Sequence, residues 1–344
     1  MGKRSYIYGA GGMGREVLAH WRSIGREPSA FIDRSAGQLP DVDGVPVIAL
    51  DAVADPASSD VLIALHSAGA DVDRVVTDLT RRGFGSVETL WSACAREQWL
   101  PRLSYWLDPM ADLAADRVAI TRARGLFTDA TSLRVFDQQC TLRSEGRYAG
   151  LDAPSPRDQY HPVDLPRWPE PLRLVDCGAF DGDSLRALRA AGYRIERALA
   201  LEPDPANFRR LAAAVADDPS IDPIEVGVHS TSCMLSFDPS NGTAAHFDEA
   251  GSVALRVVAL DALCADFHPT LIKMDIEGAE LAALEGAIQV LRRDRPGLAI
   301  SVYHKPADLW ELPLWIADLG LDYRLYLRSH AYCGFETVLY AQSA

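Results

Sequence analysis

One stretch of the chain carries the residue types that a cationic ligand with hydroxyl groups requires. An apolar run ends in Asp176, two glycines follow at Gly178 and Gly182, and a helical pattern begins after Asp183 and Ser184. Glycines let the backbone turn sharply and approach a ligand closely. The helix beyond them offers unpaired N–H groups and the positive end of its dipole. The pattern therefore predicts a strand, a tight turn and a helix start that together bind a ligand.

The acids of this turn indicate which ligand it suits. A turn that seats a pyrophosphate has the pattern Gly-x-Gly-x-x-Gly, whereas this turn carries Asp176, Asp181 and Asp183 around its two glycines. Carboxylates repel a pyrophosphate but attract a sulfonium and an amino group. Glu202 ends the next apolar run, 197–201, roughly 20 residues after the turn, where an acid hydrogen-bonds ribose hydroxyls. These charges favour S-adenosylmethionine over a nicotinamide cofactor.

Two further acids and a histidine are candidates for the chemistry. Asp275 and Glu277 follow the apolar run 271–274, and His304 follows the run 298–303. A hydroxyl that accepts a methyl group is a poor nucleophile, so a base or a metal ion should assist it. In one interpretation His304 or Asp275 is the general base. In another, Asp275 and Glu277 bind a cation such as Mg²⁺ that holds vicinal hydroxyls, and in a third Glu277 only caps the following helix.

These side chains must be positioned by alternating strands and helices. The apolar runs before Asp176, Glu202, Asp275 and His304 predict parallel strands, and ligands of open parallel sheets bind beyond the carboxyl ends of the strands. Lys273, inside one of these strands, is expected to pair with a nearby acid. Helices are predicted at 185–191, 206–215, 280–292 and 308–319, and further strands at 224–228, 234–237, 253–260, 323–327 and 337–340, the last two as an antiparallel pair. The predicted fold class is α/β with a mostly parallel, Rossmann-like sheet.

A second glycine pattern predicts a smaller Rossmann-like domain near the N-terminus. Residues 9–14 read Gly-Ala-Gly-Gly-Met-Gly and lie between a predicted strand at 5–8 and a predicted helix at 15–24. This context is the one in which Gly-x-Gly-x-x-Gly binds a nucleotide. Asp33 follows the next strand, close to the position of an acid that binds ribose. The predicted nucleotide-binding residues are Gly9, Gly11, Gly12, Gly14 and Asp33.

Residues from about 159 to 341 resemble an FkbM-type S-adenosylmethionine-dependent methyltransferase. The resemblance is carried by three motifs in order, at 175–183, 201–208 and 272–280. It implies a class I methyltransferase domain that methylates a hydroxyl, often on a sugar or a polyketide. Asp275 and His304 are then the predicted catalytic residues. The predicted cofactor-binding residues are Asp176, Gly178, Ala179, Phe180, Asp181, Gly182, Ser184, Glu202, Asn207 and Asp275.

Residues 4–90 resemble the N-terminal domain of bacterial sugar O-acetyltransferases of the sialic-acid type. The matching segments are 9–16, 31–33 and 44–48. The resemblance implies that a nucleotide sugar binds to this domain. In the alternative interpretation the domain serves docking or dimerisation and its pocket is empty.

The segment between these two domains is rich in aromatic residues and proline. Helices are predicted at 92–99 and 111–124, and the stretch 152–171 predicts a linker or extended arm. The aromatic side chains either stack on a sugar ring, as a cap over the substrate, or form core. The predicted domains are 1–90, 91–170 and 171–344, namely the nucleotide-sugar domain, the cap with its linker, and the methyltransferase domain.

Composition narrows the range of partners. The 344-residue chain has a formal net charge of -14, which argues against a general nucleic-acid surface. It contains no apolar run of about 18 residues that would span a membrane. Six cysteines without a Cys-x-x-Cys pair, and no secretion signal, predict a cytoplasmic protein with reduced thiols. The expected partner is a small-molecule or glycan acceptor, and a homo-oligomer is possible.

Two other functions are compatible with parts of the sequence. An adapter would sense a nucleotide sugar with the first domain and carry an inactive methyltransferase domain, but the intact turn, Glu202 and Asp275 argue against inactivity. An NAD-dependent sugar-modifying enzyme would use the first domain, but the Tyr-x-x-x-Lys pair is missing after that fold. The leading prediction is therefore an O-methyltransferase that acts on a sugar, a nucleotide sugar or a glycosylated metabolite.

Overall fold

The computed structural model describes residues 4–154, 158–237 and 253–343, which form two compact units. The first unit contains residues up to 112 together with 138–153 and 331–335, and the second unit contains the remainder. The middle segment 91–170 is shared between them, and helix α5 (Ala130–Glu145) contributes to both. The structure describes all six cysteines, and none of them forms a disulfide. In the described part of the chain, no helix combines the length and apolar character needed to cross a membrane.

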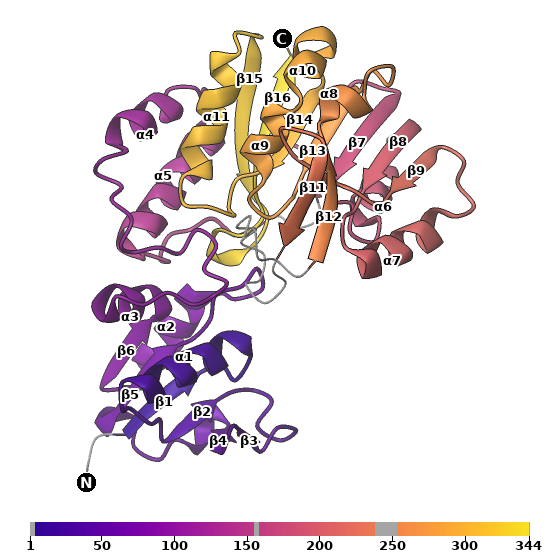
Figure 1. The fold of residues 1–344 in the computed structure, drawn as a ribbon. Coiled ribbons are helices and arrows are strands. Elements are labelled where there is room, and N and C mark those ends of the chain that lie inside the picture. The colour runs from indigo at the N-terminus through magenta and orange to yellow at the C-terminus, as the bar shows by residue number, and fades with distance from the viewer. Residues whose placement is uncertain (1–3, 155–157, 238–252, 344) are drawn as a thin grey trace. The chain divides into compact units, whose positions relative to one another are not determined.

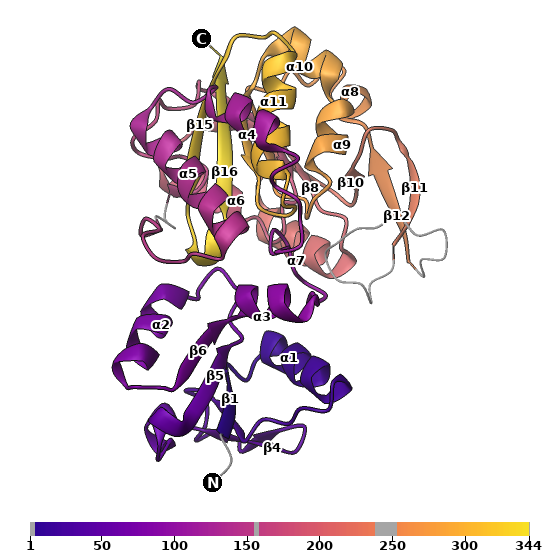
Figure 2. The same ribbon diagram turned by 90° about the vertical axis from the view of Figure 1, so that its left-hand side faces the viewer.

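The first unit is built on a six-stranded sheet. Its elements are β1 (Arg4–Tyr8), α1 (Gly12–Ser23), β2 (Ala30–Ile32), β3 (Asp41–Val42), β4 (Val45–Ile48), β5 (Ser59–Ile63), α2 (Val72–Arg81), β6 (Ser86–Thr89) and α3 (Leu90–Glu97). The strand order is β3-β4-β2-β1-β5-β6, and all neighbours except β3 and β4 are parallel. Helices α1 and α2 lie on opposite sides of this sheet (Figure 2). The predicted Rossmann-like arrangement of this part is therefore present.

The second unit is built on a seven-stranded sheet. Its main elements are α4 (Arg117–Arg124), β7 (Leu172–Cys177), α6 (Asp183–Ala190), β8 (Ile195–Leu201), α7 (Pro205–Val215), β9 (Ile221–Ile224), β13 (Leu271–Met274), α9 (Glu280–Glu285), α10 (Ile288–Asp294), β14 (Gly297–Ser301), α11 (Asp308–Asp318), β15 (Tyr323–Ser329) and β16 (Thr337–Ser343). The strand order is β15-β16-β14-β13-β7-β8-β9 (Figure 1). The five neighbouring strands β14, β13, β7, β8 and β9 are parallel to one another. Strand β16 is antiparallel to both of its neighbours, β14 and β15. The predicted fold class is confirmed.

The central strands of this sheet are buried on both faces. Every residue of β13 and β14 is buried, as are five of the six residues of β7. Strands covered by helices on both sides have continuous apolar runs of this kind rather than alternating ones. This burial explains why the runs before the candidate site residues could be recognised in the sequence.

Two predicted elements differ from the structure. The strand predicted at 224–228 is divided, because β9 joins the main sheet while β10 (Gly227–Val228) pairs in a separate three-stranded sheet with β12 (Val253–Val258) and β11 (Cys233–Phe237). The helix predicted at 280–292 is broken into α9 and α10 at Gly286. A Cβ on Gly286 would lie 2.3 Å from the carbonyl oxygen of His229, so the chain passes too close for a side chain there.

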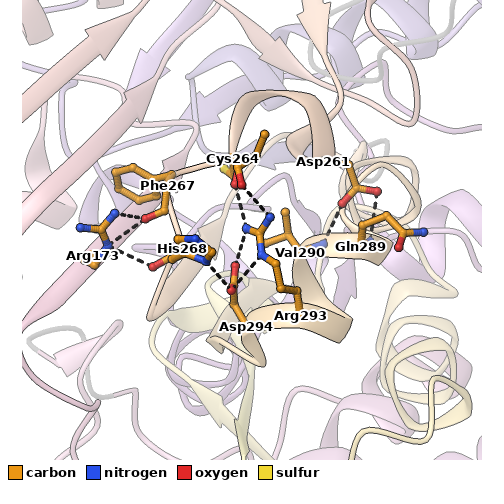
Figure 3. A network of polar contacts seen from close by, with 10 residues as sticks. Arg173, Asp261, Cys264, Phe267, His268, Gln289, Val290, Arg293 and Asp294 are labelled. Atoms are coloured by element: carbon orange, nitrogen blue, oxygen red, sulfur yellow. Dashed lines mark hydrogen bonds and ion pairs between the residues drawn. The ribbon is translucent and has the colours of Figure 1, made fainter.

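A network of polar contacts fixes the chain where it enters β13 (Figure 3). Arg293 of α10 donates a hydrogen bond of 2.8 Å to the carbonyl oxygen of Cys264, at the end of α8 (Leu260–Leu263). Asp261 of α8 accepts one of 2.9 Å from the backbone N–H of Val290. Arg173 of β7 donates to the loop that precedes β13. These contacts set the position of the strand that leads to the candidate site.

We predict that the two glycines at the start of α1 respond differently to alanine. A Cβ on Gly14 would lie 2.0 Å from the carbonyl oxygen of Gly9, whereas nothing lies within 4 Å of one on Gly12. Gly14→Ala should destabilise the first unit by about 1–3 kcal/mol, a typical cost of overpacking. Gly12→Ala should be neutral or slightly stabilising, since alanine favours a helix. Calorimetric unfolding of both variants tests this, and equal transition temperatures would contradict the close contact of α1 with the glycine turn.

Candidate active site

The carboxyl ends of four neighbouring parallel strands meet at one edge of the second unit's sheet. Strands β14, β13, β7 and β8 are adjacent in this order and parallel to one another. The loops that follow them carry His304, Asp275, the turn 178–182 and Glu202, respectively. The sequence predicts that these residues gather at one edge of the sheet, and the structure places them there.

The turn after β7 has a left-handed backbone at three positions. The φ angles are +77° at Gly178, +48° at Phe180 and +84° at Gly182. From the sequence we expected Gly178 to leave room for a ligand. Instead, a Cβ on Gly178 would lie 2.0 Å from the backbone carbonyl oxygen of Asp275. Glycine is required here because the loops after β7 and β13 approach each other closely.

Glu202 holds this turn to the loop after β8. Its carboxylate accepts hydrogen bonds of 2.9 Å from the backbone N–H groups of Phe180 and Asp204, and one of 3.5 Å from the side-chain amide of Asn207. The residue is buried, and burial raises the pKa of its carboxyl group. Oε1 accepts the bonds from Asp204 and Asn207, and Oε2 accepts the one from Phe180. Glu202 therefore positions the turn, while Oε2 retains a lone pair for a further donor.

Asp176 and Ser184 lie beneath the turn. The Asp176 carboxylate is fully buried, forms an ion pair of 3.1 Å with Nζ of Lys273, and accepts a hydrogen bond from the Ser184 hydroxyl. Lys273 also donates to the carbonyl oxygens of Cys177 and Gly178, at 3.3 and 2.6 Å. Desolvation would lower the pKa of Lys273, but Asp176 and other nearby acids raise it above its usual value. The pairing expected for Lys273 is thus observed.

The other predicted residues of the turn differ in exposure. Ala179 is fully buried and its N–H donates to the carbonyl oxygen at the end of β8. Asp181 forms an ion pair of 2.7 Å with Arg186. Phe180 is 45% exposed, and the Arg210 guanidinium lies 5.1 Å from the centre of its ring. An exposed aromatic ring at a strained turn is therefore the part of this loop that is most open to a ligand.

His304 lies among three carboxylates. Its Nδ1 is 2.9 Å from Oε1 of Glu280, and its Nε2 is 3.4 Å from Oδ1 of Asp275 and 3.5 Å from Oε2 of Glu277. Burial would lower the pKa of His304, but Glu280, Asp275 and Glu277 outweigh it and raise the pKa to about 10. The imidazole therefore carries a positive charge at neutral pH in this environment. This charge disfavours the predicted role of His304 as a neutral general base.

Two tyrosines orient the Asp275 carboxylate. The Tyr160 hydroxyl lies 3.4 Å from Oδ2 and the Tyr303 hydroxyl lies 3.4 Å from Oδ1. Tyr303 also lies 3.4 Å from Oε1 of Glu336, whose other oxygen accepts a hydrogen bond from Gln159. The Asp275 side chain is 22% exposed and that of His304 only 2%, so Asp275 is the more accessible of the two predicted catalytic residues.

One group of residues suited to a metal ion contains one member of the predicted pair. The predicted pair is Asp275 and Glu277, whereas in the described part of the chain Asp275, Glu280 and His304 place ligand atoms within 4.8 Å of one another. Glu277 joins this group through its contact with His304 and has a left-handed backbone, with a φ of +59°. Its side chain therefore points back toward His304 rather than acting only as a helix cap.

Sequence reasoning missed several members of the site for different reasons. Glu280 lies in the motif at 272–280, but its pattern predicts only the start of a helix. Tyr160 and Glu336 are distant in sequence from Asp275, and no local pattern connects them to it. Tyr303 falls at the end of a run that predicts a buried strand. One signal in the sequence could have indicated Glu280, namely that it is the third acid, after Asp275 and Glu277, within six residues.

The first unit has a related turn after β1. Gly9 has a φ of +104°, and Asp33, which follows β2, accepts a hydrogen bond of 2.9 Å from the N–H of Ala10. Gly11 and Gly12 are exposed at the start of α1. The glycines and the acid that the sequence predicts for a nucleotide site are therefore close together.

Comparisons with known proteins agree with the fold. A crystal structure of methyltransferase FkbM from Methylobacillus flagellatus KT superimposes with a TM-score of 0.81 at 24% sequence identity, covering 99% of this chain and 90% of that one. The hexuronic acid methyltransferase AglP of Haloferax volcanii is 34% identical over 101 residues, which is 27% of this chain and 42% of that protein. The match therefore spans less than half of the length of that relative.

The family match covers the segment that holds the candidate site. Residues 176–336 match the family model of the methyltransferase FkbM domain, from the turn after β7 to Glu336. This match agrees with the resemblance that the sequence motifs indicate. The turn, Glu202, Asp275 and His304 all lie within the segment that is similar to the methyltransferase FkbM domain.

Proposed function

We propose that this protein transfers a methyl group from S-adenosylmethionine to a hydroxyl of a sugar, a nucleotide sugar or a glycosylated metabolite. The observation that carries the proposal is the FkbM domain match, which spans the turn 178–182, Glu202, Asp275 and His304 at one sheet edge. The sugar acceptor is supported by the similarity to a hexuronic acid methyltransferase. A panel of nucleotide sugars and glycans, assayed with radiolabelled methyl donor, tests it.

The residues at this edge fit the cofactor. S-adenosylmethionine brings a methyl group on a positively charged sulfonium, and Asp275 and Asp181 supply negative charge where it binds. Glu202 is already oriented by two backbone N–H groups and accepts a ribose hydroxyl with the remaining lone pair of Oε2. The exposed ring of Phe180 packs against the cofactor, while Asp176 and Ser184 support the turn from below.

The reaction requires the acceptor hydroxyl to lie in line with the sulfonium. The O–CH₃ bond forms as the S–CH₃ bond breaks, and the hydroxyl proton passes to a carboxylate of the site. Asp275 is the group that meets the acceptor, because its side chain is partly exposed and is held by Tyr160 and Tyr303. His304 contributes its positive charge and fixes Asp275. A divalent cation at Asp275 and Glu277 is the alternative way to activate the hydroxyl.

The first unit binds a nucleotide sugar in this proposal. Support comes from the turn after β1, where Asp33 is held by the N–H of Ala10 while Gly11 and Gly12 remain exposed beside it. Calorimetric titration with nucleotide sugars tests this role, and Asp33→Ala should abolish the heat of binding. Titration with S-adenosylmethionine tests the second unit separately. A chain that binds nucleotide sugar but no S-adenosylmethionine would be an adapter rather than a methyltransferase.

We predict that Glu202→Ala weakens the binding of S-adenosylmethionine at least about tenfold. The variant loses a charge-assisted hydrogen bond to the ribose, worth roughly 1.5–3 kcal/mol, and loosens the turn. Glu225→Ala is the matched control, because Glu225 is an exposed acid just after the neighbouring strand β9. Isothermal titration of both variants measures the effect, and unchanged affinity in Glu202→Ala would exclude the ribose role.

We predict that Gly178→Val abolishes binding of S-adenosylmethionine because it displaces the loop that begins at Asp275. Gly192→Val controls for backbone strain, since Gly192 has a φ of +80° but a Cβ there would have nothing within 4 Å. The control should cost some stability and retain cofactor affinity. Titration and thermal unfolding measure the two effects, and normal cofactor binding by Gly178→Val would show that the two loops do not meet as described.

We predict that Asp275→Asn lowers turnover by about 10²–10⁴ while the cofactor still binds, because the charge of Asp275 acts in the transition state. His304→Ala should also lower turnover, since it removes the positive charge that holds Asp275. Asp266→Asn, at an exposed acid before β13, is the control and should be fully active. Single-turnover methyl transfer measures the rate. Full activity in Asp275→Asn would place the chemistry elsewhere.

A further inference from the structure

One nitrogen of His304 faces two carboxylates at separations that suit a shared cation. Nε2 is 3.4 Å from Oδ1 of Asp275 and 3.5 Å from Oε2 of Glu277. N–H···O hydrogen bonds are shorter, about 2.7–3.2 Å. Two ligand atoms bound to one metal at about 2.1 Å, in tetrahedral or octahedral geometry, lie about 3.0–3.5 Å apart. Both distances from Nε2 therefore match the spacing of two ligand atoms around one ion.

The other nitrogen of His304 is held by a carboxylate behind it. Nδ1 lies 2.9 Å from Oε1 of Glu280, which also accepts a hydrogen bond of 3.0 Å from the N–H of Ile276. Histidines that bind metals nearly always donate their other N–H to a carboxylate or carbonyl, which fixes the tautomer and the ring orientation. Glu280 therefore directs Nε2 toward Asp275 and Glu277.

Glu280 gives independent evidence that positive charge is required here. The residue is fully buried, and within the described ranges its second oxygen, Oε2, has no hydrogen-bond partner. It belongs to the group with Asp275 and His304 whose ligand atoms lie within 4.8 Å of one another. A buried carboxylate with an unpaired oxygen is costly unless a positive charge compensates it. One imidazole serves three carboxylates at this point, so a bound cation would restore the balance of charge.

We propose that one divalent transition-metal ion displaces the Nε2 proton of His304 to solvent and binds to Nε2, Asp275 and Glu277, with Glu280 orienting the imidazole. A mixed nitrogen and oxygen set favours Mn²⁺ or Zn²⁺ over Mg²⁺ and Ca²⁺, which prefer oxygen ligands alone. The side chains of Asp275 and Glu277 are 22% and 48% exposed, so the ion faces the side from which an acceptor enters. There it would bind the acceptor hydroxyl and make it more acidic.

The ion's role in methyl transfer rests on the proposed function, but its binding can be tested without activity. The full-length chain is stripped with chelator, and Mn²⁺ is added while the spectrum of the free ion is followed by electron paramagnetic resonance. Mn²⁺ is the better probe because the exposed thiol of Cys233 attracts Zn²⁺. We expect about one bound ion per chain. His304→Ala should weaken binding at least about tenfold, and Glu280→Gln about 10–100-fold.

The control is a second histidine–carboxylate pair in the same unit. His268 and Asp294 are 2.9 Å apart, as His304 and Glu280 are, but the His268 side chain is 59% exposed, whereas that of His304 is 2% exposed. His268→Ala should therefore leave Mn²⁺ binding unchanged. Thermal unfolding of each variant, followed by circular dichroism, shows that the chain is still folded, and titration with S-adenosylmethionine is measured separately.

Each outcome separates the two proposals. The metal site is overturned if the unmodified protein, His304→Ala and Glu280→Gln bind Mn²⁺ equally well. It is also overturned if none of the three binds Mn²⁺. S-adenosylmethionine binding without Mn²⁺ binding leaves methyl transfer intact and removes the ion from it. Mn²⁺ binding that depends on His304 in a chain that does not bind S-adenosylmethionine supports the metal site and contradicts the proposed function.

Discussion

The buried ion pair between Lys273 and Asp176 is the interaction on which the candidate site depends. Both side chains are at most 4% exposed, and two charges at this depth are tolerated only when they are paired and hydrogen-bonded. The ammonium group also binds the carbonyl oxygens of Cys177 and Gly178. One cation from β13 thus fixes the end of β7, and through it the turn that approaches Asp275. Removal of either partner would leave an uncompensated charge beneath the site.

Above this pair the site is dominated by negative charge. Asp275, Glu277, Glu280 and Glu336 lie in one connected group with a single imidazole. Such a group costs free energy in the absence of a ligand, because like charges repel and burial disfavours each of them. A sulfonium cofactor and a metal ion both supply positive charge. A positively charged ligand bound beside this group, as we propose, would offset that cost.

The parts of this protein that could be predicted from the sequence are those governed by local spacing. The turn 178–182, Glu202 and Asp275 follow buried strands, and the end of a buried strand is visible as the end of an apolar run. Helix α5 was not predicted, because its 16 residues are mostly polar and show little segregation of apolar side chains. The contacts of Tyr160 and Glu336 with the site depend on the return of distant segments to one sheet edge, which no local pattern encodes.

The two units share a glycine turn followed by an acid after the second strand, and comparing them shows what this sequence pattern does and does not predict. In each unit the acid after the second strand accepts a hydrogen bond of 2.9 Å from the glycine turn, Asp33 from Ala10 and Glu202 from Phe180. In each unit one glycine also lies where a Cβ would be 2.0 Å from a carbonyl oxygen. Glycines and an acid at this spacing are therefore required first by the packing of a parallel sheet. The charges that surround the turn, rather than its glycines, distinguish a site for a cationic cofactor from a site for a nucleotide.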